Sequence, residues 1–157
     1  MSGQVVPAIV PAVRGMFHWA TVPLLGGLLG PRPDNEHEQA AYDQRVGGLY
    51  NFLNRVYYDL RNLGVTAEDR ALNYSATNAF QVSQVIESAT NSSLELDTIT
   101  VKKSPICRPE SDCYDVELGF LEPRNVNVAS KIYRFTVDVS DVLPVTIGEV
   151  RAWSKRA

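Results

Sequence analysis

The sequence predicts an α+β protein in which helices come first and strands follow. Between residues 42 and 86 apolar side chains recur at steps of three or four, which is the period of an amphipathic helix. From residue 94 onward they alternate with polar side chains, which is the period of a strand. The polar run TNSS at residues 90–93 separates the two regions. We therefore expect an antiparallel helix pair packed on an antiparallel four-stranded meander.

Residues 1–33 differ from the rest of the chain in composition. They hold five of the nine prolines and five of the ten glycines, and their only full charges are Arg14 and Arg32. Such a segment cannot form one long helix, because proline and glycine interrupt helices. It is also too apolar to stay free in water. We expect an extended N-terminal arm across the body, followed by a short helix that Thr21 caps, with Pro23 in its first turn.

The clearest helix is predicted from Tyr42 to Leu63. Gly47 and Gly48 weaken its first half, by about 1 kcal/mol each if they are exposed. Gly64 follows directly and favours the left-handed conformation at which helices end. The buried stripe of this helix is expected to consist of Tyr42, Val46, Leu49, Leu53, Val56, Leu60 and Leu63.

A second helix is predicted after a very short connection. Thr66 is suited to cap it, and Glu68 and Asp69 lie in its first turn, where the helix dipole favours acidic groups. Its stripe is made of small side chains, so the two helices can approach closely and form an antiparallel pair over residues 40–89. The stripe is expected to comprise Leu72, Ala76, Ala79, Ser83 and Ile86, widened by Phe80, Val82 and Val85.

Four strands are predicted between residues 94 and 153. In the first of them the alternation slips between Leu96 and Ile99, which indicates a β-bulge. Short links join the strands in sequence, as in a meander. The expected segments are 94–101, 113–120, 131–139 and 143–153. Without a linker or repeat to divide it, the chain 1–157 is expected to be one domain, with the arm at 1–33, the helix pair at 40–89 and the sheet at 94–153.

Composition narrows the classes of partner. The formal net charge is −3, so the basic footprint of a nucleic-acid-binding protein is missing, and we expect no nucleic acid as a partner. The apolar run PLLGGLLG at 23–30 is too short to span a bilayer, so we expect no membrane partner. The N-terminus lacks the features of a signal peptide. We expect a cytoplasmic protein whose thiols start reduced.

A search for catalytic motifs finds none. The two histidines are His18, within MFHWA, and His37, within the acidic run DNEHEQ, and neither has a nucleophile motif around it. There is no G-x-S-x-G, no glycine-rich phosphate loop and no H-E-x-x-H. Glu36 and Glu38 form a carboxylate pair, but nothing in the sequence indicates the burial that would separate their pKa values. We expect no enzymatic activity and no cofactor.

The stretch SPICRPESDCYD at 104–115 holds both cysteines, Cys107 and Cys113. Zinc ligands usually come in pairs two to four residues apart, so a metal site would need the histidines or a second chain. A catalytic thiolate would need a positive environment, and Arg108 alone supplies little. The favoured interpretation is a hairpin in which Cys107 ends one strand, Cys113 begins the next and RPESD is the turn. The two thiols then face each other and can form a disulfide.

Four segments together resemble a known family. They are AVRGMFHW at 12–19, RVYYDLRNLGVTAEDRALNYSATNAFQ at 55–81, SPICRPESDCYDVELGFLEP at 104–123 and YRFTVDVSDVLPVTIGEVRAWS at 133–154. They resemble the C-terminal domain of unknown function in the cyanobactin maturation proteases of the PatA and PatG type. In that family a separate subtilisin-like domain carries the catalytic Asp, His and Ser. None of those motifs occurs here, so the resemblance carries over no catalytic residue.

The resemblance implies a non-catalytic accessory domain in the maturation of ribosomally made cyclic peptides. Its role would be assembly or scaffolding, with a subtilisin-like protease domain as a partner. The alternative is a peptide-binding module that recognises the precursor or its modified core through a sheet edge or an aromatic groove. Tyr50 and Tyr57 lie seven residues apart beside the main stripe, and they stay exposed if the sheet covers only one side of the helix pair. A partly apolar surface of this kind predicts a homodimer.

Overall fold

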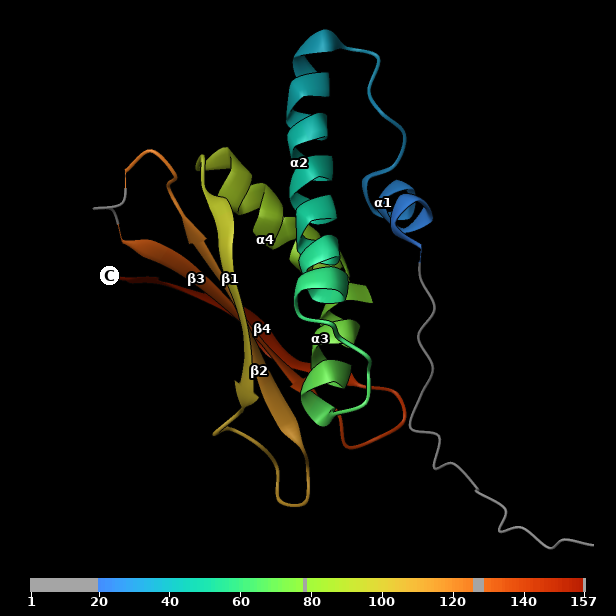
Figure 1. Ribbon diagram of the computed structural model, residues 1–157, viewed down its shortest axis with the longest axis vertical. Helices are drawn as coiled ribbons and strands as arrows, with labels where there is room; N and C mark the ends of the chain where they lie inside the picture. Colours follow the sequence, from blue (N-terminus) through green and yellow to red (C-terminus); the bar gives the residue numbers. More distant parts are fainter. Residues whose placement is uncertain (1–19, 78, 126–128, 157) are drawn as a thin grey trace, which may run out of the picture.

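The computed structural model describes residues 20–77, 79–125 and 129–156, and these residues form two layers, with helices on one face of a twisted sheet (Figure 1). The helical elements are α1 (Thr21–Leu29), α2 (Glu36–Asn54), the π-helical turn η1 (Arg55–Asp59), α3 (Ala67–Thr77) and α4 (Ala79–Asn91). The strands are β1 (Glu95–Lys103), β2 (Cys113–Leu121), β3 (Ser130–Asp138) and β4 (Val145–Lys155). The predicted α+β class is confirmed.

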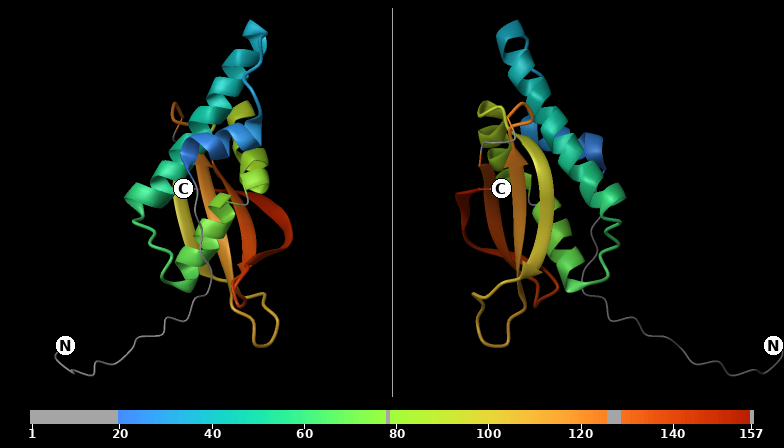
Figure 2. Two further views of the ribbon diagram at one scale, coloured as in Figure 1. Left: turned by 90° about the vertical axis from the view of Figure 1, so that its right-hand side faces the viewer. Right: turned by 60° about the vertical axis from the view of Figure 1, so that its left-hand side comes forward.

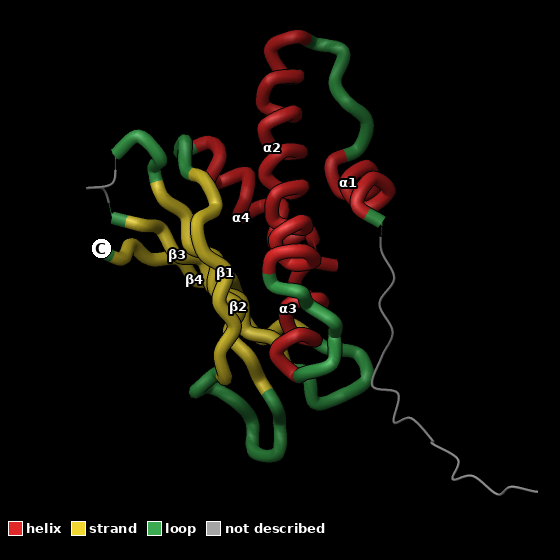
Figure 3. Tube along the Cα trace, viewed as in Figure 1, coloured by secondary structure: helices red, strands yellow, loops and turns green. Residues whose placement is uncertain are grey.

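The sheet is the meander that the sequence predicts. Its strand order is β1-β2-β3-β4, and every neighbouring pair is antiparallel. The predicted bulge in β1 is confirmed, because the register with β2 shifts between Leu96 and Thr98. A second register shift, in the pairing of β3 with β4, lies between Arg134 and Thr136. In Figure 3 the strands and the helices occupy opposite sides of the molecule.

The hydrophobic core lies between the two layers. Alternation along each central strand directs one set of side chains toward the helices, as the sequence predicts. The sheet contributes Tyr114, Val116, Leu118 and Phe120 from β2, and Tyr133, Phe135 and Val137 from β3. The helices contribute Leu25, Leu49, Phe52, Leu53, Val56, Ala71, Leu72, Ala76, Val82, Val85, Ile86 and Ala89.

The N-terminal arm is described only from residue 20 onward, so the part of the prediction that concerns residues 1–19 lies outside the described residues. The expected short helix is present as α1, with Pro23 in its first turn. The predicted cap is wrong. Thr21 is the first helical residue, while the cap position is held by Ala20, which has an extended backbone and no side chain that could accept a hydrogen bond.

The first predicted helix ends earlier than the apolar stripe suggests. The α-helix runs to Asn54 and continues as η1, and the helix ends at Leu60, whose N–H donates to the carbonyl of Arg55 at 3.0 Å. A π-turn holds an extra residue, so it rotates Leu60 out of the stripe, while Leu63 lies in the irregular segment that follows the helix. Leu60 and Leu63 are 46% and 82% exposed, contrary to the prediction, although Gly64 does adopt the predicted positive φ.

The second predicted helix is two helices, α3 and α4, joined at residue 78, which lies outside the described residues. The predicted cap is confirmed. The N–H of Asp69 donates to Thr66 Oγ1 at 3.1 Å, and the N–H of Thr66 donates back to Asp69 Oδ2 at 3.2 Å. Helix α4 runs back along α2, whereas α3 lies against the sheet (Figure 1). Among the described residues, no helix is long and apolar enough to span a bilayer.

Candidate functional site

The cysteine loop is the first candidate, and the structure joins Cys107 and Cys113 as a disulfide with their Cα atoms 5.7 Å apart. The geometry differs from the predicted hairpin, because β1 ends at Lys103 and Cys107 lies within the loop of residues 104–112. The loop folds back instead, helped by Glu110 at a positive φ of 66°. Cys113 is fully buried. This disulfide links the loop to the start of β2, and its bonded cysteines offer no free thiolate.

The base of this loop is tied to the connection between β3 and β4. The N–H of Asp112 donates to Ser140 Oγ at 2.7 Å, and the N–H of Val139 donates to the carbonyl of Asp112 at 2.9 Å. Ser140 in turn donates its hydroxyl and its N–H to Asp138. Burial acts to raise the pKa of Asp138, but the hydrogen bonds from Ser140 and Ser111 outweigh burial and hold that pKa below its ordinary value.

The candidate general bases do not assemble into a catalytic set. His37 is exposed in the first turn of α2, where its N–H donates to Asn35 Oδ1 at 3.1 Å. Glu36 and Glu38 share that first turn, are exposed, and complement the helix dipole. His18 lies outside the described residues. Within the described parts of the chain, no group of three or more His, Cys, Asp or Glu side chains is placed to hold a metal ion.

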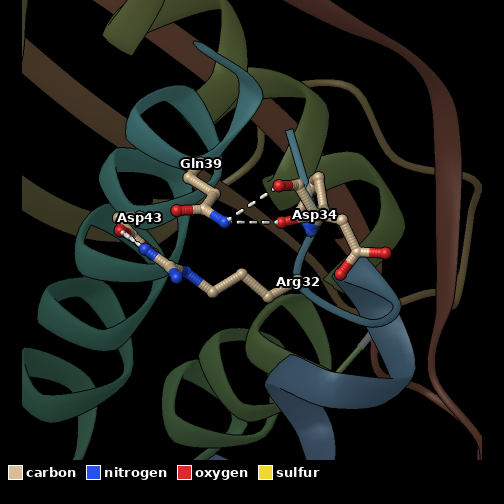
Figure 4. Close-up of polar contacts among 5 residues, drawn as sticks. Arg32, Asp34, Gln39 and Asp43 are labelled. Atoms are coloured by element: carbon tan, nitrogen blue, oxygen red, sulfur yellow. Dashed lines mark hydrogen bonds and ion pairs between the residues drawn. The ribbon is translucent and has the colours of Figure 1, made fainter. Parts of the chain in front are cut away.

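Polar side chains clamp the α1–α2 connection onto α2 (Figure 4). Arg32 meets Asp43 with two bonds, Nε to Oδ1 at 2.9 Å and Nη2 to Oδ2 at 2.6 Å, and this hydrogen-bonded guanidinium holds the pKa of Asp43 below its ordinary value. Gln39 donates to the carbonyl of Pro33 at 3.0 Å, and the Tyr42 hydroxyl donates to the carbonyl of Gly30 at 2.8 Å. These contacts hold the α1–α2 connection against α2, which is a structural role.

The face of the sheet that points away from the helices is uncovered within the described part of the chain (Figure 2). Strand alternation places several polar side chains on this face, Arg134 among them. The structure connects several of these side chains. Lys102 Nζ lies 2.6 Å from Glu117 Oε1, and Arg134 Nη1 lies 3.3 Å from Asp115 Oδ2. The guanidinium of Arg134 also lies 5.7 Å from the ring centre of Trp153.

Asp115 anchors this arrangement, since it is only 1% exposed although it belongs to the uncovered face. Its Oδ1 accepts a hydrogen bond from Thr136 Oγ1 at 2.7 Å. Its Oδ2 has no hydrogen bond of good geometry and is held by the charge of Arg134. A buried carboxylate needs such partners, so Asp115 fixes the position of Arg134 and, through it, the indole of Trp153.

A hollow of about 390 Å³ lies on the same uncovered face. Its floor includes Gly119, where an added Cβ would come 2.2 Å from Thr98 Oγ1. Its lining residues come from all four strands and are Thr98, Thr100, Lys102, Glu117, Gly119, Ile132, Trp153 and Lys155. Strand alternation alone predicts which residues share this face, but the bulge near Leu96 decides which of them border the hollow.

A larger hollow of about 620 Å³ lies at the end of the sheet where α2, α4 and the segment after β2 converge. Gly47, Asn51 and Thr90 are among its lining residues, and its charged residues are Glu95, Glu122 and Arg124. All three of these side chains are solvent-accessible. Chemically it is a polar surface depression.

The η1 patch, as we call it, is an exposed apolar surface at the end of α2. It comprises Tyr57, Tyr58, Leu60, Leu63 and Val65. Tyr50, on α2, is also exposed, as predicted for both Tyr50 and Tyr57. Arg61, which lies between Leu60 and Leu63, has a positive φ of 46°, in the left-handed region that residues other than glycine seldom adopt. A π-turn, a left-handed arginine and five exposed apolar side chains thus coincide within eleven residues, 55–65.

Comparison with known proteins gives a consistent result. The family model described as PatG C-terminal matches residues 38–153. A solved structure named "PatG Domain of Unknown Function" is 44% identical, with a TM-score of 0.68, and the match covers 98% of this chain. This chain spans 57% of the length of that solved chain. No curated protein matches the sequence.

Proposed function

This chain belongs to the PatG C-terminal family, and from that premise we propose that it is a non-catalytic accessory domain that assembles the machinery of cyanobactin maturation. Its surroundings would be the cytoplasm, and a subtilisin-like protease domain would be among its partners. The observation that carries the proposal is the η1 patch. Large apolar side chains held outside the core in this number are typical of a surface that another protein covers.

A second copy of the chain is the occupant that we propose for the η1 patch. A two-fold axis brings the patch of one copy against the same patch of the other copy. The charged residues at the edge of the patch must therefore pair with residues of opposite charge from the same set in the second copy. Asp59 and Arg61 flank Leu60 and supply one charge of each sign. Both are exposed, so Asp59 of one copy can meet Arg61 of the other across such an axis.

The local backbone supports the same proposal. A left-handed conformation at a residue other than glycine costs of order 1 kcal/mol or more, and such costs concentrate at functional surfaces. The π-turn of η1 and the end of the helix after it leave Leu60 and Leu63 exposed, although an uninterrupted helical stripe would have buried both. The strained segment therefore presents apolar side chains that an uninterrupted helix would hide.

The test is the mass in solution of a matched pair of variants. Leu63→Arg places a charge in the η1 patch, while Leu143→Arg places the same charge on an equally exposed leucine between β3 and β4. We expect light scattering to give a dimer for the parent chain and for Leu143→Arg, and a monomer for Leu63→Arg. A parent chain that stays monomeric across concentration, or equal behaviour of the two variants, would contradict the proposal.

The uncovered sheet face favours a second function, that of a peptide-binding module. It combines an accessible indole, a hollow, and two cations that have no ion pair among the described residues. Because this surface lies on the opposite side of the sheet from the η1 patch, the two functions can be tested separately.

A further inference from the structure

We propose that the uncovered face of the sheet binds an extended acidic peptide segment along β4. Two carboxylates of the peptide meet Arg151 and Lys155, and a bulky apolar side chain between them packs against Trp153 in the hollow. This inference does not depend on the assembly role, because it concerns the face of the sheet remote from the helices (Figure 2).

The order of side chains on β4 carries the charge argument. Register places Arg151 opposite Arg134 and Trp153 opposite Ile132, so both lie on the uncovered face. Lys155 is the next residue with the same orientation and lines the hollow. The strand therefore presents cation, indole and cation at successive positions on one face.

The two cations on β4 lack the carboxylate partners that their neighbours have. On the same face Glu117 pairs with Lys102, and Asp115 pairs with Arg134. Among the described residues, neither Arg151 nor Lys155 has an ion pair. Two cations without a carboxylate partner are complementary to an anionic ligand, although the chain as a whole has a formal charge of −3.

The hollow supplies the apolar half of the recognition. Its volume of about 390 Å³ falls within the range of small-ligand sites, near the low end, and suits one or two amino-acid side chains. It exists because Gly119 has no side chain and lies between Thr98 and Ile132, two residues that would touch any added Cβ. Thr98, Thr100 and the backbone edges around them add hydrogen-bonding groups to an otherwise apolar floor.

The indole at the centre of this site is held in place in advance. Trp153 is 38% exposed, and the guanidinium of Arg134 stacks on it. Arg134 is fixed in turn by the buried Asp115. A rigid aromatic anchor of this kind loses little conformational freedom on binding, which is why tryptophan is frequent among the dominant residues of interfaces.

The observations favour a peptide over a nucleic acid. A single-stranded nucleic acid needs a basic groove along its backbone and several aromatic platforms for stacking. Here one indole is flanked by two free cations, and two carboxylates, those of Asp115 and Glu117, lie on the same face. Acidic groups so near the site oppose a continuous phosphate track but tolerate two separated carboxylates.

The test uses fluorescein-labelled N-acetyl-Asp-Gly-Leu-Gly-Glu-amide, in which the two carboxylates and the leucine fall on one side of an extended chain, and its neutral counterpart N-acetyl-Asn-Gly-Leu-Gly-Gln-amide. Both peptides are titrated with the full chain by fluorescence anisotropy. We expect the acidic peptide to bind at least about tenfold more tightly than the neutral one at low salt and to weaken as salt rises. Substituting Trp19→Phe leaves Trp153 as the only indole, and its emission should change with the same titration curve.

Variants locate the site. Trp153→Ala should weaken binding by at least about tenfold. Lys155→Gln and Arg151→Gln should each weaken it by a few fold, about fivefold at most, and both are exposed enough to leave the fold intact. Lys103→Gln is the control. It also removes one positive charge, but Lys103 follows Lys102 on β1 and therefore lies on the helix-facing side of the sheet.

Several outcomes would overturn the inference. One is the absence of binding up to about 1 mM peptide. Equal affinity for the two peptides would remove the charge argument, and an equal effect of Lys103→Gln and Lys155→Gln would place binding elsewhere. Tighter binding of a short oligothymidine than of the acidic peptide would assign the face to nucleic acid. None of these results depends on whether the chain is a monomer or a dimer, so the assembly role is judged separately.

Discussion

Arg70 shows how a single side chain joins the two layers. It is buried on α3, and its guanidinium donates to the carbonyl of Val139 at 2.8 Å and to that of Asp141. These carbonyls belong to the connection between β3 and β4. A planar fork that reaches two carbonyls cannot be replaced by the single ammonium of lysine.

We expect Arg70→Lys to unfold about 2 kcal/mol more easily than the parent, because at least one buried carbonyl loses its donor. Urea denaturation followed by circular dichroism measures this difference. Arg61→Lys, an exposed position, serves as the control and should change the stability by less than about 0.5 kcal/mol. Equal stability of the two variants would show that the Arg70 contacts contribute nothing.

The disulfide permits a second prediction at this scale. Cys107 and Cys113 are six residues apart, and a bond that closes so short a loop contributes about 2 kcal/mol in the chain-entropy model. The double variant Cys107→Ser, Cys113→Ser should therefore stay folded and melt about 5 °C or less below the oxidised parent.

The same melts, repeated with and without a chelator, separate this structural role from a metal site. We expect no effect of chelation on either protein. Zinc bound at one ion per chain or per dimer, together with unfolding on chelation, would contradict the prediction and favour metal ligation by the two cysteines.

The cysteines and Asp115 show what could be predicted from single residues. The proximity of Cys107 and Cys113 followed from their spacing around a turn. The buried carboxylate of Asp115 did not, since its position on β2 indicates the uncovered face, and only the register with Arg134 and Thr136 reveals what covers it. Residues that pair across a sheet are far apart in sequence, so the pattern within a single strand does not reveal which residues of the next strand lie opposite.

Two adjacent glycines test the packing of whole elements. Gly48 lies where α2 meets α4, and an added Cβ would come 2.7 Å from Ile86 Cγ2, in the buried core. An added Cβ at Gly47 meets nothing within 4 Å. Gly48 therefore permits the close approach of α2 and α4, whereas Gly47 only weakens α2.

We expect Gly47→Ala to stabilise the protein by about 0.5–1 kcal/mol, because alanine is the better helix former and fits without contact. Gly48→Ala should destabilise it, since Ile86 must move within a packed core. Thermal melts of the two variants provide the comparison. A gain in melting temperature for Gly48→Ala would mean that α2 and α4 are not in the close contact described.

Element types were predictable here, and element boundaries were less so. Periodicity located four strands and the helical region correctly because each buries one face. It placed Leu60 and Leu63 in the core because a π-turn leaves no mark in the apolar pattern. The structure shows a tertiary contact at that turn. Arg55 at its start donates to the carbonyls of Leu96 and Asp97, so a tertiary contact with the β1 bulge accompanies the change of helix type.

Lowering the pH should reduce the stability of the whole fold, because two carboxylates that stabilise it become protonated. Asp138 and Asp43 both have folded-state pKa values below the ordinary 3.8. A depressed folded-state pKa adds stability above the unfolded-state pKa, and this contribution is lost as pH falls through the folded-state value. We therefore expect the melting temperature to fall as pH drops from about 5 to below about 3.8.

The variants Asp138→Asn and Asp43→Asn should each flatten this dependence, because asparagine does not titrate. The effect of Asp43 should also decrease at high salt, since its pair with Arg32 is exposed. An acid slope that is the same in the parent and in the double variant would assign the loss of stability to other groups.

An open sheet has two edges, and the fold restrains both of them from pairing with another chain. At the start of β1, Arg55 already occupies the carbonyls of Leu96 and Asp97. In β4, Gly148 has a positive φ of 72° and the register breaks beside it, which bends the strand. Strand edges that are occupied or bent are poor templates for fibril growth. The molecule can thus expose apolar side chains at the η1 patch and remain resistant to edge-to-edge aggregation, the usual hazard of a protein that combines a sticky surface with an open sheet.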